Sequence, residues 1–160
     1  MSEAAAKAFE LMRSDVGNDE GTGDWFQVTQ DQIDQFADVT HDHQFIHVDP
    51  EAAKATPFGT TIAHGFLTLS MLTHLAHGAS SGTPDPGKYA GMVAGVNYGF
   101  NRVRFVSPVK VGSRIRARAV TGNAELKGTT VELTRNITVE IEGEEKPALA
   151  AEWVVRTVYA

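Results

Sequence analysis

The chain of 160 residues contains no cysteine, which excludes disulfide bonds and thiol catalysis and fits a reducing compartment. It also lacks any apolar run long enough to span a bilayer. The first residues, MSEAAAKAFELMRSD, lack the basic start and apolar core of a signal peptide. Together these absences predict a cytoplasmic protein that does not act on a membrane.

Positive charge is also in short supply. Lys and Arg number 14 against 20 Asp and Glu, which gives a net charge of −6. A broad nucleic-acid surface is therefore not expected, because such surfaces are basic. Apolar residues make up 42 % of the chain, and this length suits one domain with a full core. We therefore expect a single domain over residues 1–160, without internal repeats.

The N-terminal part of the sequence predicts helices joined by polar connectors. Residues 2–13 are rich in alanine and should form a short helix, and the polar stretch 14–23 is a connector. A short strand is expected at 25–28. Thr29 and Gln32 have the spacing of a capping box, which predicts a second helix starting there.

The most apolar helix of the chain is expected at 65–77. Most of its side chains are apolar, and a helix that is apolar nearly all round is buried. Gly78 is expected to end it as the residue after the C-cap. Residues 65–78 are therefore the predicted central helix, and 79–89 the loop that follows it.

From Gly91 onward, apolar residues recur with the period of a strand. Strands are expected at 92–106, 111–121, 129–141 and 147–159, with turns at Gly122-Asn123 and within 142–145. Alternation in the third strand indicates an antiparallel sheet with one covered face. Arg135 interrupts its apolar face. We expect this residue to have an acidic or carbonyl partner, or to be exposed, because an unpaired buried charge is costly.

Long strands in series after one buried helix predict the fold class. We expect an α+β domain in which a curved antiparallel sheet, residues 91–160, wraps around the central helix. Such a sheet has open edges, and bare edges invite pairing with another chain. The sequence thus gives a motive for self-association.

The stretch 36–65 gathers histidines and aspartates at the start of this apolar helix, which is typical of a functional site. Asp49 precedes a proline and a glutamate, so it is interpreted as an N-cap. Asp42 and His47 differ, because the residues between them are partly apolar and the loop should turn inward there. The remaining histidines of the stretch are interpreted as polar loop residues (His41, His43) and as a space-filling ring near the helix start (His64).

A family resemblance rests on this stretch. Asp42-His-Gln-Phe-Ile-His47, then Val-Asp-Pro-Glu-Ala-Ala, then Phe58-Gly-x-x-Ile-Ala-His-Gly65, resembles the MaoC-like dehydratases, which include the (R)-specific enoyl-CoA hydratases. The family pattern is Asp-x-Asn-Pro-x-His, followed by a His-Gly that opens the central helix. Gln44 and Phe45 replace the Asn and Pro, a variant similar to the nodulation protein N branch. Residues 103–112 resemble the family's second signature, so the likeness covers nearly the whole chain.

The resemblance implies a fold, an assembly and a reaction. The fold is a single hotdog domain whose segment 29–65 carries the catalytic groups, and the assembly is an edge-to-edge homodimer. The reaction is the addition of water to a trans-2-enoyl thioester to give the (R)-3-hydroxyacyl thioester, or the reverse dehydration. The substrate would be an acyl-CoA or acyl carrier protein thioester, and no cofactor or metal is implied.

Five residues receive roles in this reaction. Asp42 and His47 can hold one water and exchange protons with it, and which of them moves which proton is left open. The amide of Gly65 can stabilise the thioester oxygen, and glycine allows close approach. Gln44 is expected to support the loop by hydrogen bonding. Thr73 matches by position a hydroxyl residue near the catalytic pair in some members, although helix hydroxyls often bond a backbone carbonyl.

Other interpretations stay open at this point. The chain could be a thioesterase of the same fold, or a non-catalytic subunit that binds acyl thioesters. The intact pair of Asp42 and His47 argues against both. These two residues with His41 and His43 could also ligate zinc or iron. Finally, three arginines on one strand face suit CoA phosphates, but a solvated outer face is the favoured interpretation (Arg114, Arg116, Arg118).

Overall fold

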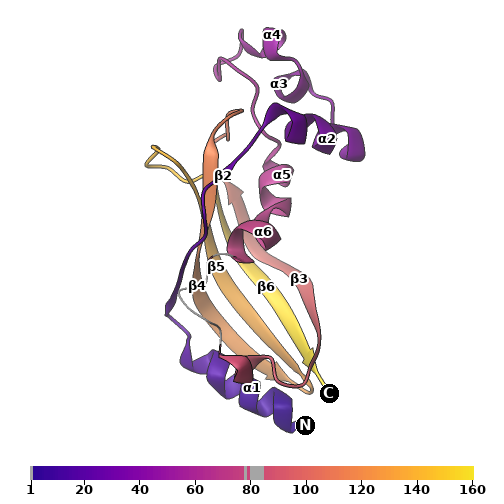
Figure 1. Ribbon diagram of the computed structural model, residues 1–160, viewed down its shortest axis with the longest axis vertical. Coiled ribbons are helices and arrows are strands. Elements are labelled where there is room, and N and C mark those ends of the chain that lie inside the picture. Colours follow the sequence, from indigo (N-terminus) through magenta and orange to yellow (C-terminus); the bar gives the residue numbers. More distant parts are fainter. Residues whose placement is uncertain (1, 78, 80–84) are drawn as a thin grey trace.

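The structure, a computed structural model, describes residues 2–77, 79 and 85–160 (Figure 1). The expected helix end at Gly78 and most of the expected loop 79–89 lie outside the described residues. The helices are α1 (Glu3–Ser14), α2 (Gln30–Thr40), α3 (Phe45–Val48), α4 (Pro50–Ala53), α5 (Gly65–Ser70), α6 (Leu72–His77) and the 3₁₀ turn η1 (Pro86–Lys88). The strands are β1 (Asp19–Thr22), β2 (Phe26–Gln27), β3 (Met92–Phe105), β4 (Arg114–Lys127), β5 (Thr130–Ile141) and β6 (Leu149–Tyr159).

One antiparallel sheet forms the body of the molecule. Its strand order is β1-β4-β5-β6-β3, and β2 also pairs with β4. Helices α5 and α6 lie against one face of the sheet, α2 to α4 extend beyond one end, and α1 lies across the other end, near both termini (Figure 1). The predicted α+β class is therefore confirmed, with β3 as an edge strand.

Two local predictions about this sheet were wrong. The expected connector 14–23 contains β1, which pairs with β4 although its sequence, Asp-Glu-Gly-Thr, has no apolar alternation to reveal it. The expected turn at Gly122-Asn123 is instead a register shift inside β4, and the chain reverses at Gly128, where φ is 66°. A side chain at Gly122 would meet the Asn136 amide at 2.9 Å, so this glycine serves close strand packing.

The predicted central helix is interrupted. Met71 separates α5 from α6, and the Ser70 hydroxyl donates to the Phe66 carbonyl at 2.7 Å just before the break. A serine that bonds back to the preceding turn bends a helix. The helix is also buried on one face rather than all round, since Phe66 is 65 % exposed.

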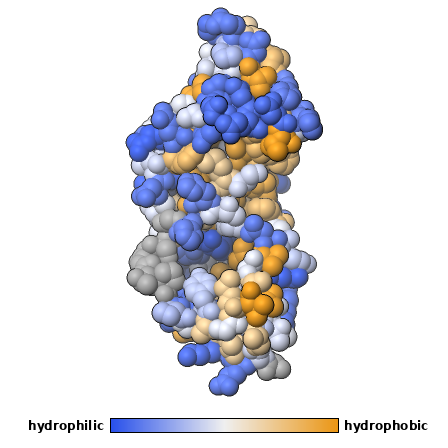
Figure 2. All heavy atoms as spheres, turned by 45° about the vertical axis from the view of Figure 1, so that its right-hand side comes forward, coloured by the Kyte–Doolittle hydropathy of each residue, from blue (hydrophilic) through white to orange (hydrophobic). Residues whose placement is uncertain are grey.

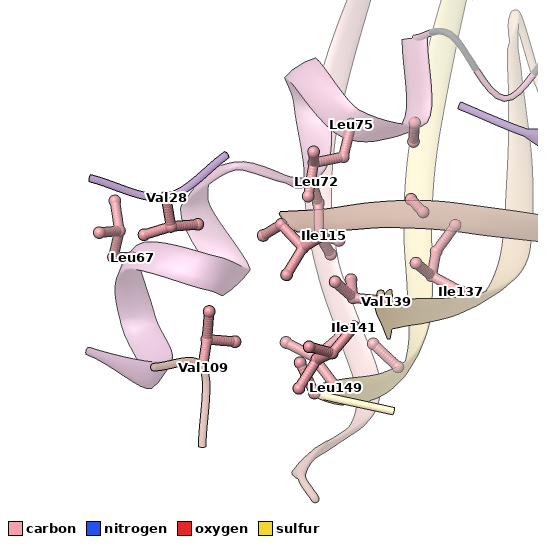
Figure 3. Close-up of a cluster of buried hydrophobic side chains, with 14 of the residues drawn as sticks. Val28, Leu67, Leu72, Leu75, Val109, Ile115, Ile137, Val139, Ile141 and Leu149 are labelled. Carbon is pink, nitrogen blue, oxygen red and sulfur yellow. The ribbon is translucent and has the colours of Figure 1, made fainter. Parts of the chain in front are cut away.

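The main core lies between α5, α6 and the sheet (Figure 3). Leu67, Leu72 and Leu75 from the helices meet side chains of β4, β5 and β6. On β5, the buried residues occupy alternate positions as predicted (Ile137, Val139, Ile141). Each such side chain contributes roughly 1.5–3 kcal/mol through burial. A second, smaller core forms where α1 packs on the far end of the sheet (Ala5, Ala8, Met12, Ala124, Val131, Tyr159).

Arg135 has an acidic partner, as predicted. Its guanidinium donates to the Glu20 carboxylate of β1, with the shortest N–O distance 2.6 Å, and the Arg135 side chain is only 15 % exposed. The Thr121 hydroxyl donates to the same carboxylate, and the guanidinium also lies 5.5 Å from the centroid of the Trp153 ring. The unrecognised strand β1 thus supplies the counter-charge that β5 needs.

Glu20→Gln should destabilise the fold by about 2 kcal/mol, because it leaves a largely buried guanidinium without a counter-charge. Chemical denaturation of both proteins measures the loss. The matched control is Asp19→Asn. Asp19 is the neighbour of Glu20 on β1 and forms an exposed ion pair with Arg118, so this change should lower stability much less. Equal losses for the two variants would contradict the role of burial.

The three arginines that share a face of β4 are engaged in ion pairs. Arg114, Arg116 and Arg118 contact Glu142, Glu140 and Asp19 at 2.9, 2.7 and 2.5 Å. Their positions agree with a solvated outer face rather than a phosphate site. Among the helices of the described residues, none is both long and apolar enough to cross a membrane.

Candidate active site

Helix α2 ends at Thr40, and the site loop, residues 41–47, follows it directly. Thr29 and Gln32 form the predicted capping box at its start. His41 ends the helix in the left-handed conformation, with φ at 62°, and is the one non-glycine residue with positive φ among the described residues. Asp42 follows this reversal, and the chain then enters α3, which carries His47 in its single turn.

His47 is held in one orientation inside the protein. Only 7 % of its surface is exposed, and its Nδ1 donates to the Ile62 carbonyl at 2.7 Å. The Gln30 amide holds the His47 carbonyl at 2.7 Å and also accepts from the buried Thr61 hydroxyl. Because Nδ1 carries the proton, Nε2 has a lone pair free to act as a base.

Burial lowers the pKa of His47 below its ordinary value, because the charged ring loses solvation. The Ile62 carbonyl opposes this shift by accepting from the ring, the neighbouring His64 adds to it, and the Asp42 carboxylate opposes it. Above its lowered pKa the imidazole is neutral, which is the state required of a base.

This shift predicts a pH dependence of stability. Below a pH of about 6.5 the unfolded chain protonates His47 while the folded protein does not. The free energy of unfolding therefore decreases as the pH decreases, until the pH reaches the lowered pKa of folded His47. At higher pH His47 is neutral in both states, and its full contribution to the free energy of unfolding is present. Melting temperatures of the wild type and His47→Gln across this range measure it. The wild type should lose more stability on acidification than the variant, and parallel curves would contradict the shift.

Asp42 and His64 lie beside His47. One nitrogen or carboxylate oxygen from each of the three residues lies within 4.8 Å of the others. Asp42 is exposed, whereas the two histidines are buried. The site therefore combines a solvent-accessible carboxylate with a shielded imidazole, close enough for both to contact one water molecule.

Gly65 begins α5 at the edge of a cavity of about 310 Å³. The cavity is lined by two separate segments, one containing His47 to Thr68 and the other Phe105 to Val109, together with Ala148. Within the described part of the chain, the Gly65 N–H has no backbone acceptor outside its own helix. This amide can therefore donate to a ligand oxygen in the cavity.

The structure does not bring all five predicted residues together. His47 and Gly65 line the cavity, and a carboxylate oxygen of Asp42 lies within 4.8 Å of a ring nitrogen of His47. The backbone N–H of Gln44 donates weakly to the Asp42 carboxylate at 3.4 Å. The Gln44 side chain makes no capping bond. Thr73 is exposed on α6 and lines a different cavity of about 850 Å³, so its proposed role has no support from the geometry.

Sequence reasoning missed Thr68, which is 3 % exposed and lines the cavity with Gly65 and His47. Its position one helical turn after Gly65 was the available signal, because residues three apart share a helix face. It also missed the support that Gln30 and Thr61 give to His47. The hydrogen bond between Thr61 and Gln30 joins residues 31 positions apart, so no local sequence pattern reveals it.

The metal site considered from the sequence does not form as proposed. His43 instead pairs with Asp38 on the surface at 2.8 Å, and His41 serves as the cap of α2. His47 and His64 are stacked, with ring centroids 3.8 Å apart and planes 26° apart. An ion bound by two imidazoles lies in both ring planes, so these nearly parallel rings would have to turn before they could share one.

Comparisons with known proteins place the chain in a family. Residues 13–142 match the model of the MaoC like domain. The chain belongs to the MaoC-like dehydratase family. Nodulation protein N of Rhizobium meliloti is 50 % identical over 141 residues, covering 87 % of this chain and 84 % of that protein. The 3-hydroxyacyl-thioester dehydratase Z of Mycobacterium tuberculosis is 49 % identical over 144 residues, covering 89 % and 91 %.

A solved structure of the family confirms the predicted hotdog fold. The (R)-hydratase from A. caviae involved in PHA biosynthesis superposes with a TM-score of 0.64 at 26 % identity, covering 88 % of this chain and 94 % of that one. The likeness to the nodulation protein N branch, predicted from Gln44 and Phe45, is confirmed as well. Both sequence signatures of the family contribute to the cavity, since its walls come from residues 47–68 and 105–109.

Proposed function

We propose that the protein is a hydro-lyase that adds water to trans-2-enoyl thioesters to give (R)-3-hydroxyacyl thioesters, and catalyses the reverse dehydration. The observation that carries this proposal is that His47 lines one cavity with Gly65 and also lies beside the Asp42 carboxylate, with a ring nitrogen and a carboxylate oxygen within 4.8 Å of each other. The relatives named as a dehydratase and an (R)-hydratase support it.

In the hydration direction, one water sits between the Asp42 carboxylate and Nε2 of His47. Its oxygen bonds to C3 of the substrate as the pair removes one of its protons, and a proton from the pair is delivered to C2. Electron density shifts onto the thioester oxygen, where the Gly65 N–H donates to it. The buried position of His47 excludes bulk water from the ring, so the hydrogen bond that Nδ1 donates to the Ile62 carbonyl fixes the tautomer of the ring.

The proposed substrate carrier is CoA or acyl carrier protein, both of which bear phosphate. Four basic side chains have no carboxylate within 4.0 Å among the residues the structure describes: Lys7, Arg104, Lys110 and Lys146. In the sequence, the last three lie within two positions of residues that line the cavity, namely Phe105, Val109 and Ala148. In an acidic protein, uncompensated positive charge beside the cavity favours an anionic carrier.

We also propose that the protein is a homodimer that pairs through β3. This strand ends the sheet, and apolar side chains are exposed along it (Met92, Val93, Val96, Tyr98, Phe100, Phe105). Figure 2 brings this side of the molecule forward and shows apolar surface on it. An exposed, long, apolar edge strand is a pairing site, and a second copy offers a matching edge.

The dimer is tested by sedimentation of the wild type and Val93→Asp. A charge on the edge should shift the mass toward that of the monomer. Val39→Asp, an equally exposed valine on α2, is the control and should sediment as the wild type does. A monomeric wild type would refute the assembly.

The activity is tested by incubation with crotonyl-CoA. Loss of the conjugated enoyl absorbance, with no release of free thiol, is expected for a hydratase. Free thiol would instead identify a thioesterase. Binding with neither change would identify an acyl-thioester-binding subunit, the remaining alternative.

A further inference from the structure

His64 contacts each of the three parts of the proposed active site. Its Nε2 donates to the backbone carbonyl of Asp42 at 2.9 Å. Its ring stacks on the ring of His47. Its own carbonyl accepts from Leu67 and Thr68 at 3.0 and 3.3 Å, so the residue also forms the first turn of α5 that presents the Gly65 amide.

The surroundings of His64 fix its ring. The residue is 2 % exposed, and the Phe36 ring of α2 packs against it with centroids 5.0 Å apart. Its Nδ1 is the one buried side-chain polar atom without a partner that is found among the described residues. The ring thus lies between the Phe36 ring and the His47 ring, and its one observed hydrogen bond is to the Asp42 carbonyl of the site loop.

That hydrogen bond matters because it acts on Asp42 itself, whereas the hydrogen bonds with Gln30, Ile62 and Asp38 hold the residues that follow it. The Asp42 carboxylate has only the long contact from the Gln44 amide, and His41 before it occupies a left-handed conformation. Among the described residues, the bond from His64 is the one hydrogen bond between the Asp42 backbone and the start of α5. Without this bond the Asp42 end of the loop can shift, and a displacement of about 1 Å can cost a hundredfold in rate.

We propose that His64 is a positioning residue, which holds the Asp42 carboxylate, the His47 imidazole and the Gly65 amide in one arrangement through its hydrogen bond and its stacked ring. This inference rests on the proposed function and goes beyond it, because the proposed chemistry uses none of the atoms of His64. The residue supplies geometry, and Asp42 and His47 supply the proton transfers.

Two substitutions separate the two contacts. His64→Phe keeps a flat ring against His47 but removes the donor to Asp42. His64→Gln keeps a donor at a similar reach but removes the stacked ring. We expect His64→Phe to lower kcat by about tenfold to a hundredfold with KM nearly unchanged. His64→Gln should recover part of that loss, which a role in packing alone does not predict.

A second readout does not depend on activity. His47 faces two titratable groups, Asp42 from the loop and His64 from the segment before α5, while its neighbour on α2 is the uncharged Gln30. His64 contributes to the low pKa of His47. NMR titration of the His47 ring should therefore show a higher pKa in both variants. If the wild type proves inactive on enoyl thioesters, this titration still decides the coupling.

The matched control is His74→Phe. His74 lies on α6 and packs edge-on against Phe26, with ring centroids 5.2 Å apart, away from the cavity. This variant should keep the wild-type kcat and the wild-type titration of His47. The proposal is overturned if folded His64→Phe retains wild-type kcat, if His64→Gln and His64→Phe lose activity equally, or if neither variant moves the titration of His47.

Discussion

His47→Gln is expected to lower turnover by about 10²- to 10⁴-fold, the range that general acid–base catalysis contributes. Glutamine can still donate to the Ile62 carbonyl, which holds the imidazole at 2.7 Å, but it offers no basic nitrogen to the water. Asp42→Asn should cost a similar factor, because it keeps the shape of the side chain and removes its charge and basicity. KM should change little in both, since neither group is proposed to bind the substrate.

The control for these losses lies in the same loop. His43 is exposed and pairs with Asp38, outside the cavity. His43→Gln should therefore leave turnover unchanged. Measured kcat values of the variants test these expectations, and melting temperatures at neutral pH confirm that each variant is folded. A His47→Gln enzyme that turns over at the wild-type rate would remove His47 from the chemistry.

Gly65→Val is expected to leave a folded protein with turnover reduced by about 10²- to 10³-fold, as when an oxyanion donor is lost, because the new side chain keeps the substrate oxygen away from the Gly65 N–H. A Cβ at position 65 would lie 3.0 Å from the Phe105 ring. That ring is half exposed and also meets Phe66 edge-on, so it can move outward without disturbing the core. The added methyl groups would occupy the side of the cavity from which a thioester approaches the Gly65 N–H.

A graded series tests whether crowding at position 65 causes the loss, because every variant in it keeps the backbone N–H. Gly65→Ala introduces the same close contact with Phe105 and should lose less activity than Gly65→Val. Phe105→Ala combined with Gly65→Ala removes the clash and should recover part of the loss. Melting curves show whether each variant is folded. A folded Gly65→Val enzyme with near-normal kcat would take the Gly65 amide out of the proposed oxyanion role.

Much of the fold could be predicted because its signals are local. Alternating apolar residues in β5, the capping box at Thr29 and the apolar stretch after Gly65 each reflect interactions between neighbours in the sequence. The strand β1 could not be predicted in this way, because its four residues are held by β4, about 100 positions later. The break at Met71 accompanies a hydrogen bond from the Ser70 hydroxyl to the Phe66 carbonyl. The periodicity of apolar residues does not show whether a serine hydroxyl bonds to a carbonyl or to solvent.

The candidate site divides in the same manner. Asp42, His47 and Gly65 were predicted because the family motif fixes their spacing. The structure places His47 and Gly65 at one cavity and Asp42 beside His47. Thr73 was chosen by position relative to the motif, but the break between α5 and α6 and the course of the chain leave it at another cavity. His64 was interpreted as filling space. Its bond to the Asp42 carbonyl spans 22 positions and appears only once the chain is folded.

A double-mutant cycle in kcat shows whether Asp42 and His47 act as one unit on one water. If both groups hold the same water, Asp42→Asn added to His47→Gln should cost much less than it does in the wild type, because residues that act as a unit are strongly non-additive. We expect the double variant to be only slightly slower than the slower single variant, with KM near the wild-type value. Losses that multiply, in folded proteins, would contradict the shared water and assign the two residues separate roles.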